Sequence, residues 1–453
     1  MHGRARLPAI PGAVATGFHV KTHAARRGQR AMTPSHRVTT PVAQQLASTR
    51  RPVMVVIASN DFQGESVNLG AAAKIASLVR IFGRLGFDVH YVDTSHWTPR
   101  WARPVLARPS AIEDTPVTLW RPFQLAHRKV GKVLNVLAAD GFFAQLRRAN
   151  PALVWIYNSY AMEGALAQRF ASIGVPFVLE LEDLPRARRR GWNPKPLWDQ
   201  RYLDALLPAA ALVTFVNKGL LDRYAGRCKA TFLLPSVLHD TLAGLSRPQR
   251  FVSSPYRVGY FGGLVREKGA NVMLDALAAL PANWQMVVTG VGELGPAFQS
   301  AAQASPDRLE FHGAVSRQAL MALMQSCDVI VNPHQSIEAM QDGVFPFKVC
   351  EAIASGALLI TTPLPSIGES FGRGAMSFDG SAKGLQRALA DAHRHDQENA
   401  TEINELRARV VDAYSEQAIA GRLAAALAGL PDAGFAPELF VHAASANVTA
   451  GVA

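Results

Sequence analysis

The sequence has few cysteines and no long apolar run, and both absences narrow what the protein can be. Its 453 residues include only Cys228, Cys327 and Cys350, which lie far apart. This spacing argues against a disulfide framework or a zinc site and is typical of a protein in a reducing compartment. Cys327 and Cys350 lie in apolar segments, so we expect both to be buried thiols. No stretch of 18 apolar residues occurs, so no membrane-spanning helix is predicted.

Acidic residues are absent from the first 50 positions, and this absence explains most of the net charge. Those positions hold eight Lys and Arg, so removing them from the total of +12 leaves +4 for the remaining 403 residues. The body is therefore only mildly basic, which argues against nucleic acid as a partner. The leader, residues 1–50, lacks hydrophobic periodicity and is expected to be disordered. Its composition also resembles a transit peptide, and a third interpretation is that translation begins at Met32.

The length and the order of apolar segments predict an α/β protein with two domains. A chain of 453 residues is two or three times the size of an average domain. Apolar runs of strand length at 53–59 and 87–92 flank a helical stretch that ends near residue 85. This is a βαβ unit, which implies a parallel sheet. Residues 51–245 form the predicted N-terminal domain, with further strands expected at 152–157, 176–180 and 211–216 and a helix at 161–173.

The same alternation restarts after a proline-containing linker at 243–255. Residues 256–430 form the predicted C-terminal domain, and 431–453 form a tail. The expected strands of the C-terminal domain are 256–261, 285–289, 309–311, 329–332 and 358–362. Its expected helices include 270–279, 317–326, 347–354 and 402–430. Two Rossmann-like, doubly wound parallel-sheet domains would place the best ligand site in a central cleft, beyond the carboxyl ends of the strands.

The segment 95–150 does not fit this rhythm, because Pro and Trp interrupt it. Within it, residues 128–148 place basic and apolar side chains at roughly helical spacing. Such a helix could lie on a membrane surface and meet anionic lipid. An ordinary amphipathic helix with a solvated basic face gives the same pattern.

Two glycine-bearing turns follow strands in the C-terminal domain. After the strand at 256–261 come Gly262 and Gly263, then the cations Arg266 and Lys268. Glycine lets backbone N–H groups approach an anion, and the helix that follows adds a positive dipole end, so a diphosphate would fit here. The alternative is a simple turn with cations facing solvent. The second turn, at Gly290, is weak evidence by itself because such turns are common in α/β proteins.

The segment 345–356 carries the third feature. Phe345 and Pro346 lead into a short helix in which Lys348 and Glu351 lie three residues apart on one face. A carboxylate there can accept hydrogen bonds from both hydroxyls of a ribose, while the lysine neutralises phosphate. The alternative is a surface ion pair. No metal is expected, because cations and helix dipoles can hold the phosphates.

Together these features resemble the C-terminal half of the family 4 (group 1) glycosyltransferases, retaining enzymes of the GT-B fold. The resemblance rests on Lys268-Gly269, on Gly290-Val-Gly292 and on the box from Glu351 to Gly356. It covers about 160 residues well and the first domain only loosely. It implies that the C-terminal domain binds the donor, with Lys268 on its diphosphate and Glu351 on its ribose.

Two departures from the family pattern stand out. The family's phosphate arginine falls near Gly263, so Arg266 is expected to substitute for it. The family's first glutamate falls at Gly343, and Asp342, or less favourably Glu338, could take its role. A subgroup with Phe-Pro-x-Lys before the second glutamate resembles this chain better, and it implies that Lys348 shares the donor-binding work. Asp342 and Lys348 are the predicted catalytic residues.

The resemblance makes the N-terminal domain the acceptor-binding one. Its first loop runs from Asn60 to Gly64, and Asn158 falls where the family often has a histidine. Glu182 and Asp183 end a strand and could meet acceptor hydroxyls, or they could be a solvated turn with a capping Asp. The four arginines within 186–190 could bind a phosphorylated acceptor or form a solvated loop.

The resemblance implies a retaining glycosyltransferase that moves a sugar from a nucleoside-diphosphate sugar to a glycan or lipid-linked acceptor. Bacterial surface polysaccharide synthesis is the expected pathway. The expected location is the cytoplasm, and the basic helix leaves peripheral contact with the inner face of the membrane open. Three alternatives remain: a sugar-nucleotide epimerase, a phosphorylase on the same fold, or a nucleotide-sugar-binding protein without activity.

Overall fold

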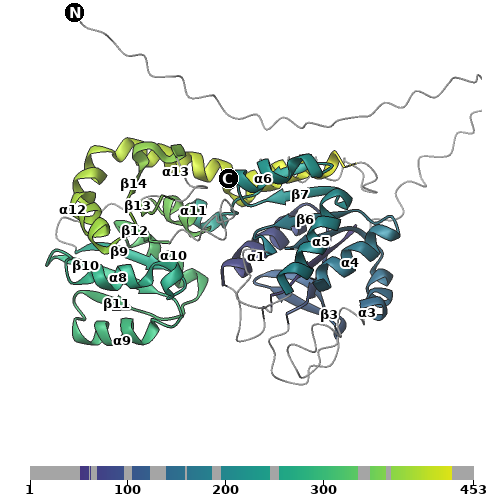
Figure 1. Ribbon diagram of the computed structural model, residues 1–453, viewed down its shortest axis with the longest axis horizontal. Coiled ribbons are helices and arrows are strands. Elements are labelled where there is room, and N and C mark those ends of the chain that lie inside the picture. The colour runs from purple at the N-terminus through teal and green to yellow at the C-terminus, as the bar shows by residue number, and fades with distance from the viewer. Residues whose placement is uncertain are drawn as a thin grey trace, which may run out of the picture. The chain divides into compact units, whose positions relative to one another are not determined.

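The computed structural model describes residues 51–60, 62, 69–95, 105–122, 139–158, 161–185, 195–244, 255–334, 347–363 and 369–430. These residues form two sheets with helices on both faces of each (Figure 1). The predicted fold class, two Rossmann-like α/β domains, is confirmed.

The first sheet has eight strands in the order β3-β4-β2-β1-β5-β6-β7-β8. Its strands are β1 (Val53–Ala58), β2 (Asp88–Asp93), β3 (Val105–Ile112), β4 (Thr115–Arg121), β5 (Pro151–Tyr157), β6 (Phe177–Leu181), β7 (Leu212–Phe215) and β8 (Thr231–Leu233). Neighbouring strands are parallel, except that β3 pairs antiparallel with β4 at one edge. The β3–β4 hairpin and β8 were not predicted from the sequence.

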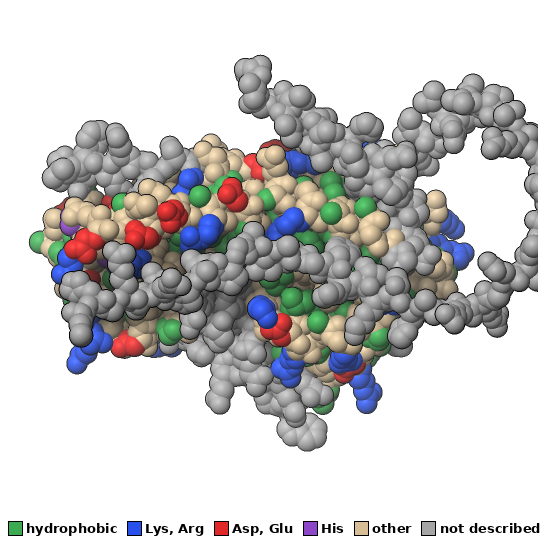
Figure 2. All heavy atoms as spheres, turned by 90° about the horizontal axis from the view of Figure 1, so that it is seen from above, with side chains coloured by type: hydrophobic (Ala, Val, Ile, Leu, Met, Phe, Trp, Pro, Cys, Tyr) green, Lys and Arg blue, Asp and Glu red, His purple; other side chains and the backbone are tan. Residues whose placement is uncertain are grey.

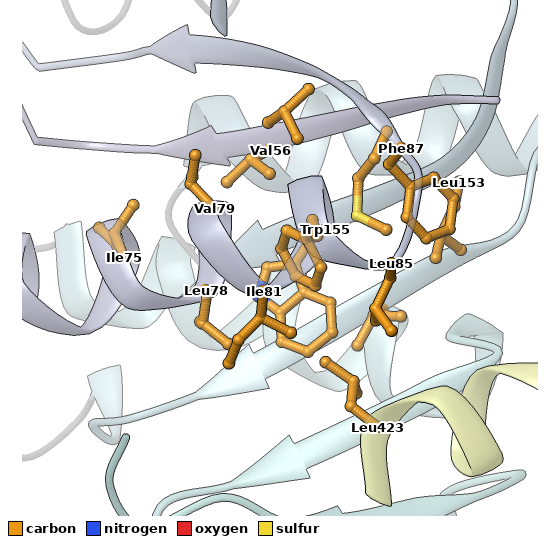
Figure 3. Close-up of a cluster of buried hydrophobic side chains, with 14 of the residues drawn as sticks. Val56, Ile75, Leu78, Val79, Ile81, Leu85, Phe87, Leu153, Trp155 and Leu423 are labelled. Atoms are coloured by element: carbon orange, nitrogen blue, oxygen red, sulfur yellow. The ribbon is translucent and has the colours of Figure 1, made fainter. Parts of the chain in front are cut away.

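Each face of this sheet packs on its own set of helices. The helices are α1 (Leu69–Arg84), α3 (Ala139–Leu146), α4 (Ala161–Ser172), α5 (Lys195–Ala209), α6 (Lys218–Tyr224) and, far along the chain, α14 (Glu416–Ala428). The short helix α7 (Asp240–Ala243) instead packs in a cluster of the second sheet through Leu242. Alternate residues of β1 enter two clusters, because side chains of a strand point to opposite faces. Val56 belongs to a buried cluster with side chains of α1 and α14, among them Leu78 and Leu423 (Figure 3), whereas Val55 packs with α3 to α6.

The second sheet has six strands, all parallel, in the order β11-β10-β9-β12-β13-β14. They are β9 (Tyr256–Phe261), β10 (Trp284–Thr289), β11 (Leu309–Phe311), β12 (Val329–Asn332), β13 (Leu358–Thr361) and β14 (Ala375–Ser377). The helices are α8 (Ala270–Leu277), α9 (Gly295–Ala304), α10 (Arg317–Gln325), α11 (Phe347–Ala354), α12 (Ala382–Glu398) and α13 (Ala400–Tyr414). The predicted strands of this domain are confirmed to within one residue at each end.

The C-terminal end of the chain departs from the expected domain boundary. The helix predicted at 402–430 is two helices, α13 and α14, because Ser415 interrupts it and caps α14 by accepting a hydrogen bond from the Ala418 N–H. Apolar side chains of α14, among them Ile419 and Leu423, belong to the same buried cluster as α1. Residues 416–428 therefore pack with the N-terminal domain, although the sequence placed them in the C-terminal one.

Among the described residues, no helix is long and apolar enough to cross a membrane. Of the predicted basic helix at 128–148, the structure describes only the part from residue 139, where α3 begins. In Figure 2, acidic and basic side chains are interspersed over the visible face. This pattern agrees with the small net charge beyond residue 50. Cys327 and Cys350 are buried, as expected, and all three cysteines are free thiols.

Candidate active site

The glycine turns after β9 and β10 touch each other. A Cβ at Gly290 would lie 1.8 Å from the carbonyl oxygen of Gly262, so the two backbones approach more closely than any other residue allows. Both glycines also have positive φ, 151° at Gly262 and 140° at Gly290. The Gly262 N–H donates to the Thr289 carbonyl at 3.1 Å. The two turns thus form one rigid glycine-lined surface at the carboxyl ends of adjacent strands.

Lys348 lies on this surface, although it is 86 positions further along the chain than Gly262. It is in the first turn of α11, and its Nζ is 3.3 Å from the position that a Cβ on Gly262 would take. The same Nζ lies 4.9 Å from the centroid of the Tyr260 ring. Burial, and then the positive charge of Lys268, lower the pKa of Lys348 to about 7. This ammonium is therefore poised to gain from a nearby anion.

Lys268 is the second cation at this surface. It ends the short 3₁₀ helix Arg266–Lys268, and its Nζ is 2.8 Å from Nε2 of His334. Burial lowers the pKa of Lys268, against the attraction of Asp183 and Glu267. Asp183 belongs to the N-terminal domain, so this predicted acceptor residue lies close enough to act on the donor-side lysine. Arg266, by contrast, has an exposed side chain.

The position after Lys268 must be glycine because the backbone there packs directly on Pro333. Gly269 has a φ of 75°, and a Cβ there would lie 1.9 Å from the carbonyl oxygen of Pro333. Only glycine lets the turn that carries Lys268 pack directly on the backbone after β12. This close approach places Lys268 next to His334, which directly follows Pro333.

Glu351 lies one turn after Lys348 in α11. Its carboxylate is 3.8 Å from the Arg317 guanidinium of α10, so Glu351 pairs with Arg317 and not with Lys348, the partner that the alternative interpretation gave it. Burial raises the pKa of the Glu351 carboxyl, and Arg317 partly offsets this. Arg317 is the cation that pairs with Glu351 among the described residues, and at 3.8 Å this pair leaves the carboxylate with acceptor capacity for hydroxyl groups.

The strand end at Glu180–Asp183 holds a buried ion cluster rather than a solvated turn. Lys74 of α1 lies 2.8 Å from the Glu180 carboxylate and also pairs with Glu182, and all three side chains are buried. Its Nζ donates to the Leu234 carbonyl at 2.8 Å, and Trp155 donates to Glu180 at 2.7 Å. Burial raises the pKa of Glu182 well above its usual range, against the attraction of Lys74. The carboxylate of Glu182 is thus already engaged by Lys74.

Asn158 and Asn60 shape the backbone of this edge. Asn158 has a φ of 63°, and its Oδ1 accepts hydrogen bonds from the N–H groups of Glu182 (2.9 Å) and Asp183 (3.2 Å). The Asn60 carbonyl accepts a hydrogen bond from the Tyr91 hydroxyl at 2.6 Å, and Asn60 is buried. Asn60 and Asn158 lie just after the ends of β1 and β5, where the sequence predicted acceptor contacts.

Lys74 also connects the two predicted halves of the site. Its Nζ lies 5.0 Å from the centroid of the Phe347 ring, and Phe347 packs on the apolar cluster of the N-terminal domain. Phe347 directly precedes Lys348. Sequence reasoning missed Lys74, His334 and Arg317. A lysine in the middle of the apolar helix at 69–84 was the one available signal for Lys74.

Several predicted site residues lie outside the described residues: Gly64, Glu338, Asp342, Phe345, Pro346 and the arginines within 186–190. Their predicted roles stay predictions. Among the residues that the structure does describe, no three His, Cys, Asp or Glu side chains are grouped so that they could hold a metal ion.

Residues 255–395 match the family model "Glycosyl transferases group 1". The matched segment begins at β9 and includes Lys268, Lys348 and Glu351. The second domain is thus similar to the group 1 glycosyltransferases. No curated protein sequence matches the chain significantly.

Solved structures share the architecture at low sequence identity. HepE from Anabaena in complex with UDP is 17% identical, with a TM-score of 0.58 over 84% of this chain and 100% of that one. The lipopolysaccharide outer core galactosyltransferase WaaB is 12% identical, with a TM-score of 0.56 over 83% and 99%. The catalytic domain of starch synthase IV from Arabidopsis thaliana, bound to ADP and acarbose, is 12% identical, with a TM-score of 0.56 over 87% and 100%. These likenesses establish the GT-B fold.

Proposed function

We propose that the protein is a glycosyltransferase that uses a nucleoside-diphosphate sugar as donor. The observation that carries this proposal is the convergence of Lys268 and Lys348 on the Gly262 turn. Two ammonium groups held close together repel each other, and burial deprives them of water. An anion with at least two charges, such as a diphosphate, relieves both costs. The family match over this segment and the UDP bound to HepE support the choice of a nucleotide ligand.

The donor would bind with its diphosphate on the two lysines and its ribose toward Glu351. Lys348 and Glu351 lie one turn apart in α11, which suits a ligand whose phosphate and ribose are adjacent. Stabilisation of the departing diphosphate by preorganised cations is the main chemistry that these residues supply. We propose transfer with retention, because the resemblance to family 4 implies it; enzymes of that family need no dedicated protein nucleophile. Lys348 is the catalytic residue among those described, and Asp342 remains the proposed second one.

The acceptor would approach from the N-terminal domain and contact Asn60, Asn158 and Asp183. Asp183 is the acidic residue there that acts electrostatically on Lys268. We propose a glycan or lipid-linked acceptor and a role in bacterial surface polysaccharide synthesis, and WaaB, a lipopolysaccharide galactosyltransferase of the same fold, supports that direction. No metal is needed in this arrangement.

Donor binding is tested first with a panel of nucleoside diphosphates and nucleotide sugars in a thermal-shift assay, since a ligand that binds the folded state raises the melting temperature. With the best donor, Lys268→Ala and Glu351→Ala should each weaken binding at least about tenfold, or about 1.4 kcal/mol. Lys218→Ala and Glu405→Ala are matched controls, because both side chains are exposed on other helices. Unchanged affinity in both site variants, with the fold intact, would remove the site assignment.

Product analysis separates transfer from its alternatives. A transferase forms a new glycosidic bond only when an acceptor is present, whereas an epimerase alters the donor sugar without one. A protein that binds the donor in calorimetry but turns over none, with or without acceptors, would be a binding protein. For Asp342, the expected result of Asp342→Asn is a larger loss of turnover than of donor affinity.

A further inference from the structure

We propose that His334 is a positioning residue of the donor site, which acts by holding the Lys268 ammonium in place. This inference rests on the proposed function and adds a residue that the sequence motifs do not contain. Lys268 Nζ and His334 Nε2 are 2.8 Å apart, a hydrogen-bond distance. Because an ammonium can only donate, we assign Nε2 as the acceptor, on a neutral ring that carries its proton on Nδ1.

The position of His334 is fixed from two sides. Its backbone carbonyl accepts a hydrogen bond from the Thr362 hydroxyl at 2.6 Å, at the end of β13. The residue before it, Pro333, packs its carbonyl oxygen against Gly269 so closely that a Cβ would not fit. His334 itself is 1% exposed. The imidazole is therefore a preorganised acceptor for Lys268. Contacts of His334 with Thr362 and of Pro333 with Gly269 hold it in place before any ligand binds.

The neutral ring has a chemical advantage over a carboxylate at this position. A carboxylate would neutralise Lys268 and compete with the donor for it, whereas a neutral imidazole orders the ammonium and leaves its full charge for an anion. The ammonium has three N–H groups, so two remain after the bond to His334. Fixing one of them directs the others, which is how a second residue can strengthen phosphate binding without touching phosphate.

The contact itself is tested without any donor. The pH dependence of acetylation of Lys268, followed by mass spectrometry, reports its pKa. His334→Leu removes an acceptor that favours the ammonium, so the midpoint for Lys268 should move to lower pH, while the exposed Lys218 in the same sample should not change. His334→Gln places an amide oxygen near the former Nε2 and should restore the wild-type midpoint. Identical midpoints in wild type, Leu and Gln variants would overturn the inference.

The consequence for binding is tested by calorimetry with UDP and with inorganic pyrophosphate. His334→Leu should weaken both ligands about tenfold or more, the scale of one hydrogen bond to a charged group, and His334→Gln should stay within about twofold. In a Lys268→Met background, His334→Leu should add no further loss, because the two residues act as one unit. If Leu does not fold, His334→Asn serves instead, since its shorter amide cannot reach Lys268.

The outcomes separate the two proposals. If the wild type binds UDP and the Leu or Asn variant binds it equally well, the role of His334 is refuted and the proposed function stands. If Leu weakens UDP equally with and without Lys268, His334 acts on the fold and not on the lysine. If the wild type binds no nucleoside diphosphate in the panel, the proposed function fails, and this inference fails with it.

Discussion

Single side chains set the electrostatics of the donor surface, and Lys348 has the most perturbed environment among them. It lies against a glycine turn, over the Tyr260 ring and next to a second lysine. Nothing in that set stabilises its charge strongly. Burial and like charge therefore lower its pKa to about 7, far below the ordinary lysine value of 10.5.

Donor affinity should fall with rising pH because of Lys348. Below pH 7 its amine is already charged; above pH 7 the free protein must take up a proton before the lysine can pair with a diphosphate. With a pKa of about 7, affinity for UDP-glucose should fall about tenfold between pH 6 and pH 8. The phosphate diesters of a nucleotide sugar do not titrate in this range. Calorimetry across this range checks the slope, and Lys348→Arg should flatten it, because arginine stays charged. A slope retained in the Arg variant would assign the titration to another group.

Lys74 should be the most stabilising of the buried charges at the strand end. Lys74→Met would leave Glu180 and Glu182 buried without their cation, so we expect a loss of about 3–5 kcal/mol in the free energy of unfolding. Glu182→Gln should cost less, because Lys74 and Glu180 remain as a pair. Urea denaturation at pH 7 compares the two. Equal losses would show that the cluster is not held by Lys74.

The same Gln variant tests the sign of the Glu182 shift. A carboxyl with a raised pKa binds more protons in the folded state, so its contribution to stability is lost as pH rises from the usual value toward the raised one. Stability of the wild type should therefore decline more over this range than stability of Glu182→Gln.

At the scale of single residues, the sequence predicted the residues that stand in motifs but not the side chains that contact them. Lys268, Lys348 and Glu351 stand in short patterns with fixed spacing. Lys74 reaches Glu182 across 108 positions and Lys268 reaches His334 across 66. Such contacts follow from how strands are ordered in a sheet, and a single sequence carries no direct signal for that order.

Strands and helices were predictable where one physical signal dominates. The fully buried strand β1 is a continuous apolar run, and β12 is apolar up to its last residue, Asn332, so the bounds of both follow from the sequence. The β3–β4 hairpin was missed because it is an edge pair with few buried residues and contains Pro109 and Pro116. The break at Ser415 was missed because Leu238 imposes it: the Leu238 N–H donates to Tyr414 and its carbonyl accepts from Glu416.

The site residues lie on turns, and Gly269 offers a test of the turn that holds Lys268. Gly269→Ala must place a Cβ against the Pro333 carbonyl in a left-handed conformation. Gly313 is a matched control, because its φ is similar, 62°, but a Cβ there meets nothing within 4 Å. Gly313→Ala should cost about 1 kcal/mol in the free energy of unfolding, and Gly269→Ala about 1–3 kcal/mol more. Urea denaturation measures both. Equal costs would mean that the close approach to Pro333 relaxes freely.

At the scale of the whole molecule, helix α14 of the C-terminal part packs on helix α1 of the N-terminal domain. Helix α14 follows the C-terminal sheet but packs on α1, which follows the first strand. The Arg80 guanidinium of α1 makes a bidentate ion pair with the Glu416 carboxylate at the start of α14, with N–O distances of 2.9–3.0 Å. The Arg84 guanidinium lies 3.2 Å from the same carboxylate. Glu416 is fully buried. The sequence alone could not show this packing, because α14 has the same rhythm as the helix before it.

The contacts between α14 and α1 should make α14 part of the cooperative fold. Glu416→Ala removes the carboxylate that pairs with Arg80 and Arg84. We expect the free energy of unfolding to fall by about 3 kcal/mol, near the lower end of values for broken buried ion pairs. Asp222→Ala is the control: it breaks a pair with Lys218 in which both side chains are largely exposed, and it should cost less than about 0.5 kcal/mol. Thermal denaturation measures both, and hydrogen exchange locates the effect. Amides of α14 should exchange faster in Glu416→Ala, while those of α13 stay protected. If α14 keeps its protection, the apolar contacts of Ile419 and Leu423 hold it without the ion pair, and the arginines serve another purpose.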